Sequence, residues 1–189
     1  MVLQEKITDT YDVVIAGAGP AGLTAALYCG RSKLRTLLIE KAQAGGQVNL
    51  TECVENYPGL YKSSARAFVE ALTSQVKDLP SVQSENFKEL AEIRYENDLI
   101  KLGIASLSDE PRSIYGARAL IIATGAHPKQ LGLPGENELR GKGVSYCAVC
   151  DGAFFRDKEV TVIGGGDTSL QEALYLTKFA RKVSVIHRR

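Results

Sequence analysis

Two cysteines and an aspartate form the group of side chains best suited to chemistry in this sequence. Cys147 and Cys150 are separated by two residues, and Asp151 follows directly. A Cys-x-x-Cys pair can accept electrons by thiol–disulfide exchange, and a carboxylate beside it can transfer a proton as thiolates form and are consumed. In a reducing compartment such a pair is more often redox-active or metal-binding than structural. We predict that these three residues are catalytic.

The remaining cysteines and the histidines do not suggest a metal site. Cys29 falls within an apolar-periodic segment and is expected to be a small buried hydrophobe, whereas Cys53 is expected in a loop. Together with His127 and His187 they are scattered, without the paired spacing of zinc ligands. We therefore predict no metal and assign redox chemistry to the Cys-x-x-Cys pair.

Two glycine fingerprints flank the dithiol, one at Gly17–Gly22 and the other at Gly164–Ser169. Residues 12–41 align with residues 159–188 without a gap, and the agreement extends well beyond the glycines. The sequence therefore contains an internal repeat. One nucleotide could deliver a hydride and the other could carry it as a flavin, so a dithiol between two such sites predicts electron transfer to a disulfide.

Each copy of the repeat has the parts of a βαβ dinucleotide-binding unit. An apolar strand, Val13–Ala16 or Val160–Ile163, enters the glycine turn; an apolar-periodic helix follows, and then a second strand, Arg35–Ile39 or Lys182–Ile186. The glycines allow a tight turn, close approach of the backbone to a pyrophosphate, and close packing of helix on strand. The helix N-terminus offers unpaired N–H groups to the phosphates.

The two copies differ where the second strand ends. Glu40 ends the first copy, and a carboxylate there can accept hydrogen bonds from an unmodified ribose. His187 has the equivalent place in the second copy and precedes Arg188 and Arg189, whose guanidinium groups can bind a 2′-phosphate. We predict FAD or NAD in the first site and NADP in the second; the alternative for the basic residues is a solvated strand end. Ser169 departs from the usual glycine or alanine but is small.

Length, composition and charge set wider limits. A chain of 189 residues with 44% hydrophobic residues allows one or two domains with a core. A net charge of +1 gives no electrostatic reason to expect nucleic acid or an anionic membrane as a partner. Met1–Thr10 has no apolar secretion signal, and no apolar run reaches membrane-spanning length. A cytoplasmic enzyme is expected.

The sequence between the first fingerprint and the dithiol predicts scaffold. Phe68, Leu72 and Val76 recur at helical spacing within residues 64–77, which predicts an amphipathic helix. Short β-patterned runs follow and predict a meander added to a parallel sheet, with a turn at residues 96–98. These runs are Ala91–Tyr95, Leu99–Ala105 and Ala119–Ala123. Gly125 and Pro128 predict a domain junction.

Taken in order, these motifs resemble those of the bacterial-type, low-molecular-weight thioredoxin reductases along the whole chain. The matching motifs are Gly17–Gly22, Gly45-Gly46-Gln47, Glu55–Gly59, Ala123-Thr124-Gly125, Cys147–Gly152, Gly164–Asp167 and His187–Arg189. The resemblance implies an α/β fold of two Rossmann-like dinucleotide-binding domains. We expect a FAD-binding domain with an added β-meander at residues 1–127 and a partial NADPH-binding domain carrying the dithiol at residues 128–189.

The resemblance also implies the cofactor-binding residues. Those expected at FAD are Gly17, Gly19, Pro20, Ala21, Gly22, Glu40, Lys41, Gly46, Gln47, Asn56, Thr124 and Gly125. Among these, Gln47 and Asn56 would lie by the flavin, and Thr124 and Gly125 would border the pyrophosphate. Those expected at NADPH are Gly164, Gly166, Asp167, Thr168, Ser169, His187, Arg188 and Arg189.

By the same resemblance, electrons would pass from NADPH to FAD, then to the Cys147–Cys150 disulfide, and finally to the disulfide of thioredoxin or a thioredoxin-like protein. Cys150 would be the sulfur nearest the flavin, and Cys147 would attack thioredoxin. The family brings both the dithiol and the nicotinamide to one flavin by rotating its domains, for which residues 125–128 would form one hinge strand. A homodimer is implied as well.

Members of this family continue beyond the point that corresponds to residue 189, so we expect a fragment that binds its cofactors weakly and does not turn over. Three alternatives remain. Alkyl hydroperoxide reductase flavoproteins add an N-terminal thioredoxin-like region that is not expected here. Flavin disulfide oxidases generally lack the nicotinamide fingerprint, which residues 164–189 supply. A nonenzymatic flavin or nucleotide-binding module would not need a dithiol.

Overall fold

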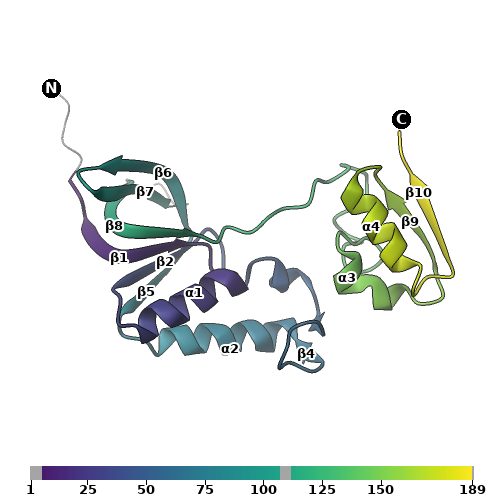
Figure 1. The fold of residues 1–189 in the computed structure, drawn as a ribbon, viewed down its shortest axis with the longest axis horizontal. Helices are drawn as coiled ribbons and strands as arrows, with labels where there is room; N and C mark the ends of the chain where they lie inside the picture. The colour runs from purple at the N-terminus through teal and green to yellow at the C-terminus, as the bar shows by residue number, and fades with distance from the viewer. Residues whose placement is uncertain (1–5, 107–111, 189) are drawn as a thin grey trace. The chain divides into compact units, whose positions relative to one another are not determined.

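The computed structural model describes residues 6–106 and 112–188. It divides into two compact units, Met1–Val54 with Lys62–Ala126 and Glu55–Tyr61 with His127–Arg189. The helices and strands of both units are labelled in Figure 1. No helix in the described part of the chain is both long and apolar enough to cross a membrane.

The first unit is built on a sheet whose strands follow the order β5-β2-β1-β8-β7-β6. Strands β5, β2, β1 and β8 run parallel, and β8, β7 and β6 form an antiparallel meander. The elements of the sheet and its helices are β1 (Asp9–Ala16), α1 (Pro20–Arg31), β2 (Thr36–Glu40), α2 (Ala65–Lys77), β5 (Val82–Asn86), β6 (Lys88–Glu96), β7 (Leu99–Ser106) and β8 (Ser113–Ile122). A short 3₁₀ helix, Gly46–Leu50, and the two-residue strands β3 (Cys53–Val54) and β4 (Ser63–Ser64) lie between β2 and α2.

Both faces of the central strands are buried, which explains their nearly continuous apolar sequence. Successive side chains of β1 point to opposite faces. Val13 and Ile15 pack on the face covered by α1 and α2 (Figure 1). Val14 shares the other cluster with Leu102 and Ile104 of β7, so the meander folds back over the parallel strands.

The structure confirms the predicted fold class and several local predictions. Helix α2 occupies the predicted segment, and the hydroxyl of Ser64 caps it by accepting the N–H of Ala67 at 3.1 Å. The meander is present, and its β6–β7 turn places Asn97 and Asp98 at φ angles of 52° and 58°. This left-handed conformation suits asparagine and aspartate better than most residues.

Four local predictions need correction. Strand β5 was not predicted, because its sequence Val-Gln-Ser-Glu-Asn has one apolar residue and its pairing with β2 is set by the fold. Strand β8 begins at Ser113, not at Ala119, since antiparallel pairing with β7 extends it through a mixed sequence. Cys53 lies in β3, paired with Ser64, not in a loop. Cys29 packs against the core but is half-buried, not fully buried.

The second unit contains the repeated βαβ segment and the dithiol. Its elements are α3 (Ala148–Asp151), a 3₁₀ turn at Gly152–Phe155, β9 (Glu159–Ile163), α4 (Asp167–Leu176) and β10 (Lys182–Ile186). Strands β9 and β10 pair in parallel. Ala173 and Leu176 of α4 are buried, and the ring of Tyr175 lies 5.5 Å from that of Phe179, centroid to centroid.

The internal repeat has the same geometry in both units. In β1 and β2, Val13 pairs with Thr36 and Ala16 with Ile39. The equivalent residues of β9 and β10 pair in the same register, Val160 with Val183 and Ile163 with Ile186. The N–H of the first glycine also donates to the second strand in each copy, over 2.8 Å in the first and 2.9 Å in the second. The aligned sequences therefore fold into equivalent βαβ turns.

Candidate active site and dinucleotide sites

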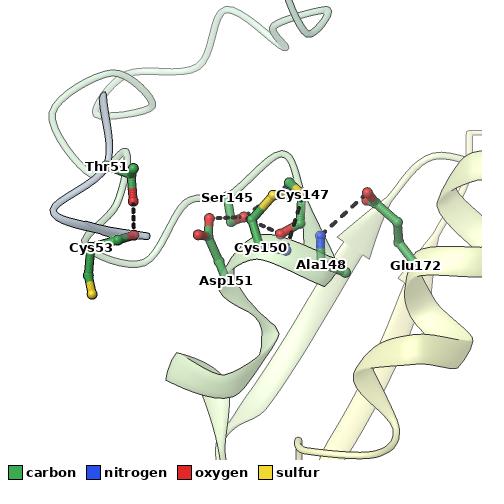
Figure 2. Close-up of a disulfide and its surroundings, with 8 residues drawn as sticks. All are labelled: Thr51, Cys53, Ser145, Cys147, Ala148, Cys150, Asp151 and Glu172. Carbon is green, nitrogen blue, oxygen red and sulfur yellow. Dashed lines mark hydrogen bonds between the residues drawn. A yellow bond between two sulfur atoms is a disulfide. The ribbon is translucent and has the colours of Figure 1, made fainter. Parts of the chain in front are cut away.

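The three predicted catalytic residues come together in one tight turn of the second unit (Figure 2). Cys147 and Cys150 form a disulfide, with their Cα atoms 5.3 Å apart. Cys147 is in an extended conformation directly before α3, and its Sγ accepts the N–H of Cys150 at 3.2 Å. Cys150 is exposed and Cys147 is half-buried. The turn thus holds both sulfurs in bonding range, and Cys150 is the more exposed residue of the two.

Asp151 is tied to the same turn through its backbone and its side chain. Its N–H donates to the carbonyl of Cys147 at 3.0 Å. Its Oδ2 accepts the hydroxyl of Ser145 at 2.5 Å, and that hydroxyl oxygen accepts the N–H of Cys147 at 3.1 Å (Figure 2). A proton donor or acceptor is therefore fixed beside the dithiol.

The dithiol turn packs on α4, the helix of the second βαβ segment. Glu172 of α4 accepts the N–H of Ala148, the first residue of α3, at 3.4 Å (Figure 2). Ala148 and Gly152 are buried. A Cβ on Gly152 would lie 3.4 Å from the rings of Tyr175 and Phe179, so a small residue allows this close packing. Because α4 begins at the second glycine turn, the dithiol and that turn belong to one compact unit.

In the first unit, the glycine turn is packed against the end of β8. Gly17 has φ of 102°, and a Cβ on it would lie 2.3 Å from the carbonyl oxygen of Ala123. A Cβ on Gly22 would lie 1.8 Å from the carbonyl oxygen of Gly17. These two positions need glycine for the turn itself. Thr124 and Gly125 follow Ala123 directly, and the Cα of Thr124 would lie 3.0 Å from a Cβ on Gly17.

Glu40 completes the first turn from the end of β2. Its Oε2 accepts the N–H of Ala18 at 2.7 Å, and its Oε1 accepts the N–H of Ala42 at 2.9 Å. The carboxylate therefore lies against the glycine turn, where a ribose is predicted. The segment after β2 also closes on the turn, since the N–H of Gly45 donates to the carbonyl of Ala18 at 2.8 Å and a Cβ on Gly46 would lie 3.3 Å from the Cα of Gly19.

The other residues predicted at FAD are placed as follows. Pro20 and Ala21 open α1, with proline at a position where its missing N–H costs no helical hydrogen bond. Lys41 forms an ion pair with Glu89 of β6, at 2.8 Å. Gln47 lies in the 3₁₀ helix that begins at Gly46. Asn56 belongs to the Glu55–Tyr61 segment, which groups with the second unit, so its place beside a flavin stays a prediction.

The second glycine turn repeats the first with two side-chain differences. Gly164 has φ of 139°, and a Cβ on it would lie 2.3 Å from the hydroxyl oxygen of Ser169, the residue that replaces the third glycine. A Cβ on Gly165 would lie 2.3 Å from the imidazole of His187. The histidine therefore reaches the turn from the end of β10, as Glu40 does in the first copy.

The remaining residues predicted at NADPH lie at the start of α4 and after β10. Gly166 is the residue before α4, and Asp167, Thr168 and Ser169 form the first turn of the helix. Arg188 follows β10. Arg189 lies outside the described residues.

Both turns leave open space at their second glycine. A Cβ on Gly19 would meet only the Cα of Gly46, at 4.0 Å, and no described atom lies within 4 Å of a Cβ on Gly166. The protein's own packing therefore does not demand glycine at either position, whereas a pyrophosphate approaching the backbone would. Within the described residues there is no group of three or more histidine, cysteine, aspartate or glutamate side chains that could hold a metal.

Glu136 is a site residue that the sequence did not predict. It is buried, and it accepts the Tyr146 hydroxyl at 2.5 Å and the N–H groups of Leu131, Gly132 and Leu133 at 3.0, 2.7 and 3.2 Å. These donors, the tyrosine hydroxyl above all, lower the pKa of Glu136 to about 2. The same hydrogen bond raises the pKa of Tyr146.

Glu136 thus joins residues 131–133 to Tyr146, the residue directly before Cys147. The Pro134-Gly135 pair was a signal for a turn at this point. The sequence could not show that Glu136 bonds to Tyr146, because the tertiary fold brings these two residues together.

Comparison with known proteins agrees with this arrangement of two glycine turns and a dithiol. The family model for pyridine nucleotide-disulphide oxidoreductases matches residues 11–189. The chain belongs to this family.

Within that family, several thioredoxin reductases are similar to this chain. The thioredoxin reductase of Bacillus subtilis (strain 168) is 48% identical over 187 residues, which are 98% of this chain and 55% of the relative. That of Listeria innocua serovar 6a is 45% identical over 189 residues, 100% of this chain and 56% of the relative. The chain therefore spans about half the length of these curated relatives.

Solved structures of thioredoxin reductases also match this chain. The thioredoxin reductase from Streptococcus pyogenes MGAS5005 matches with a TM-score of 0.84 and 44% identity, over 95% of this chain and 56% of the other. The thioredoxin reductase from Giardia duodenalis matches with a TM-score of 0.85 and 37% identity, over 96% of this chain and 57% of the other.

The two glycines of the first turn should respond differently to alanine. We expect Gly22→Ala to lower the free energy of unfolding by about 3 kcal/mol, at the upper end of overpacking costs, because the methyl group meets a backbone oxygen. Gly19 has φ of −72° and open space, so Gly19→Ala should leave that free energy within about 0.5 kcal/mol. It should nevertheless weaken FAD binding. Urea unfolding and FAD titration of the apoprotein measure the two effects; equal stability of both variants would contradict the packing described.

Glu136 should make stability depend on pH at low pH. Its pKa falls from an ordinary 4.5 to about 2 on folding, so its contribution is present above pH 4.5 and is lost as the pH falls toward 2. The difference in thermal midpoint between the parent protein and Glu136→Gln should therefore shrink over this range. Glu138→Gln, at an exposed neighbouring acid, is the control and should show no such trend. A pH-independent difference at Glu136 would refute the assignment.

Proposed function

We propose that this chain is part of an NADPH-dependent flavoprotein disulfide reductase that reduces the disulfide of thioredoxin or a thioredoxin-like protein. The observation that carries the proposal is the dithiol turn, in which Cys147, Cys150 and Asp151 are joined by hydrogen bonds. This turn packs on α4 of a βαβ segment that repeats the one in the first unit. Similarity to thioredoxin reductases supports the choice of protein substrate.

The two glycine turns are proposed to hold different dinucleotides. Glu40 lies against the first turn, where its carboxylate favours a ribose with free hydroxyls and disfavours a 2′-phosphate; this supports FAD. His187 reaches the second turn, and Arg188 and Arg189 follow it in sequence; this supports NADPH. We accordingly propose a FAD-binding domain at residues 1–127 and an NADPH-binding domain at residues 128–189.

The chemistry of this chain's own residues follows from the dithiol turn. NADPH and FAD, when bound, supply the two electrons that break the Cys147–Cys150 bond. The sulfur of Cys147 then attacks the thioredoxin disulfide and forms a mixed disulfide, and the sulfur of Cys150 displaces the reduced thioredoxin and restores the starting bond. Asp151 takes up and returns the proton that accompanies the dithiol. In sum, one NADPH and one proton convert one protein disulfide to two thiols.

Three further features are proposed from the resemblance. The domains rotate about residues 125–128, so that the dithiol and the nicotinamide reach the flavin in turn. The protein forms a homodimer. It acts in the cytoplasm.

An anaerobic NADPH titration of the full-length, FAD-loaded protein tests the electron path. Flavin bleaching should require about two hydride equivalents per chain, one for the flavin and one for the disulfide. Cys150→Ser has no disulfide to reduce and should require about one. Uptake of one equivalent by the parent protein would leave the dithiol outside the path and reduce the assignment to a simpler flavin oxidoreductase. Full function of the Cys150→Ser variant would favour a nucleotide-binding module.

A crosslink between the two domains tests the rotation. A crosslink that fixes one orientation should permit one half-reaction, flavin reduction by NADPH or disulfide reduction by the flavin, and should block the other. Stopped-flow absorbance follows each half-reaction separately. Unchanged turnover of the crosslinked protein would contradict the rotation while leaving the electron path in place.

A further inference from the structure

Ser145 occupies a position in the dithiol turn that the proposed reaction has not used. Its hydroxyl lies between the carboxylate of Asp151, at 2.5 Å, and the backbone N–H of Cys147, at 3.1 Å (Figure 2). We propose that Ser145 is a positioning residue, which holds the carboxylate of Asp151 at the dithiol for proton transfer. This inference rests on the proposed function, in which Asp151 handles the proton.

The direction of these hydrogen bonds follows from the groups involved. A serine hydroxyl has one proton to donate and lone pairs to accept. The N–H of Cys147 can only donate, so it occupies a lone pair of the hydroxyl oxygen. The hydroxyl proton is then available to the Asp151 carboxylate, whose oxygen is at 2.5 Å, compared with 3.3 Å for the carbonyl oxygen of Cys147. The chain of contacts runs from the backbone of Cys147 through Ser145 to Asp151.

The backbone alone does not fix the carboxylate of Asp151. The N–H of Asp151 bonds to the carbonyl of Cys147, which sets the last residue of α3 but leaves the side-chain torsions free. Asp151 is only half-buried, so its carboxylate could otherwise turn toward water. A hydroxyl donating to a carboxylate makes a charge-assisted hydrogen bond, roughly twice as strong as a neutral one. Ser145 thereby selects the side-chain orientation in which the carboxylate lies at its hydroxyl, which also accepts the N–H of Cys147.

This position was not evident from the sequence, because serine two residues before a cysteine has many ordinary roles. The structure distinguishes it by the two partners of one hydroxyl, which lie six and two residues away in the chain. The nearby Glu136 and Tyr146 pair holds the preceding part of the same segment. Glu136 bonds to Tyr146 and to the backbone of residues 131–133, whereas Ser145 bonds to Asp151 and Cys147, so the two sets of hydrogen bonds can be tested separately.

A double-mutant cycle on the full-length, FAD-loaded protein tests the proposal, with oxidised thioredoxin from Bacillus subtilis as the substrate. Ser145→Ala should lower kcat about tenfold, a part of the 10²–10⁴ that general acid–base catalysis contributes, and should leave the KM for thioredoxin unchanged. Ser145→Thr retains the hydroxyl and should restore kcat to within about twofold of the parent protein. Ser184→Ala, a serine substitution in β10 of the same unit, is the matched control and should have no effect.

The cycle is completed in an Asp151→Asn background. If Ser145 acts through the carboxylate, Ser145→Ala should cause no further loss there, so the two effects are non-additive. If the kcat losses of Ser145→Ala and Asp151→Asn multiply in the double variant, the proposal is overturned and Ser145 has a structural role. The same holds if Ser145→Thr fails to restore kcat although its urea midpoint is unchanged. If Asp151→Asn itself keeps full activity, the positioning role fails with it. The hydride count from the NADPH titration would still decide the electron path independently.

Discussion

In each copy of the repeated segment, the turn between strand and helix is so tight that a side chain on its first glycine would overlap neighbouring atoms. In the first copy the carbonyl oxygen of Gly17 occupies the place where a side chain on Gly22 would begin. This steric constraint fixes the direction of α1, and α1 in turn covers one face of the sheet with Leu23 and Ala26. The second copy meets the same constraint with Ser169, whose hydroxyl lies beside the bare Cα of Gly164.

In the second copy, helix α4 contacts both the glycine turn and the dithiol turn. The N-terminus of α4 belongs to the proposed dinucleotide site, while Glu172, further along the same helix, holds the start of α3. One rigid element thus connects the glycine turn with the dithiol. Within the dithiol turn, the Ser145 hydroxyl bonds to Asp151. The segment before the turn is held by the hydrogen bond from Tyr146 to the buried Glu136.

The sequence was enough to predict the repeat and its glycine turns, because each βαβ segment is formed by residues that are near one another in the chain. The register of β1 with β2, and of β9 with β10, follows from apolar strands joined by a helix of fixed length. Strand β5 was not readable, since its polar sequence becomes a strand only through pairing with β2. For the same reason the partners of Glu136 and Ser145 were missed: their side chains meet because the loop folds back, and no spacing rule encodes that.

The contact between Gly165 and His187 bears on how the two halves of the chain diverged. Residues 18 and 165 are equivalent in the repeat, as are residues 40 and 187. Ala18 has a methyl group and faces a carboxylate, whereas Gly165 has none and faces an imidazole ring that fills the space. A histidine placed at residue 40 as it is at 187 would meet that methyl group. In each copy, therefore, the side chain that ends the second strand has to match the residue after the first glycine: glutamate lies beside alanine, and histidine lies beside glycine.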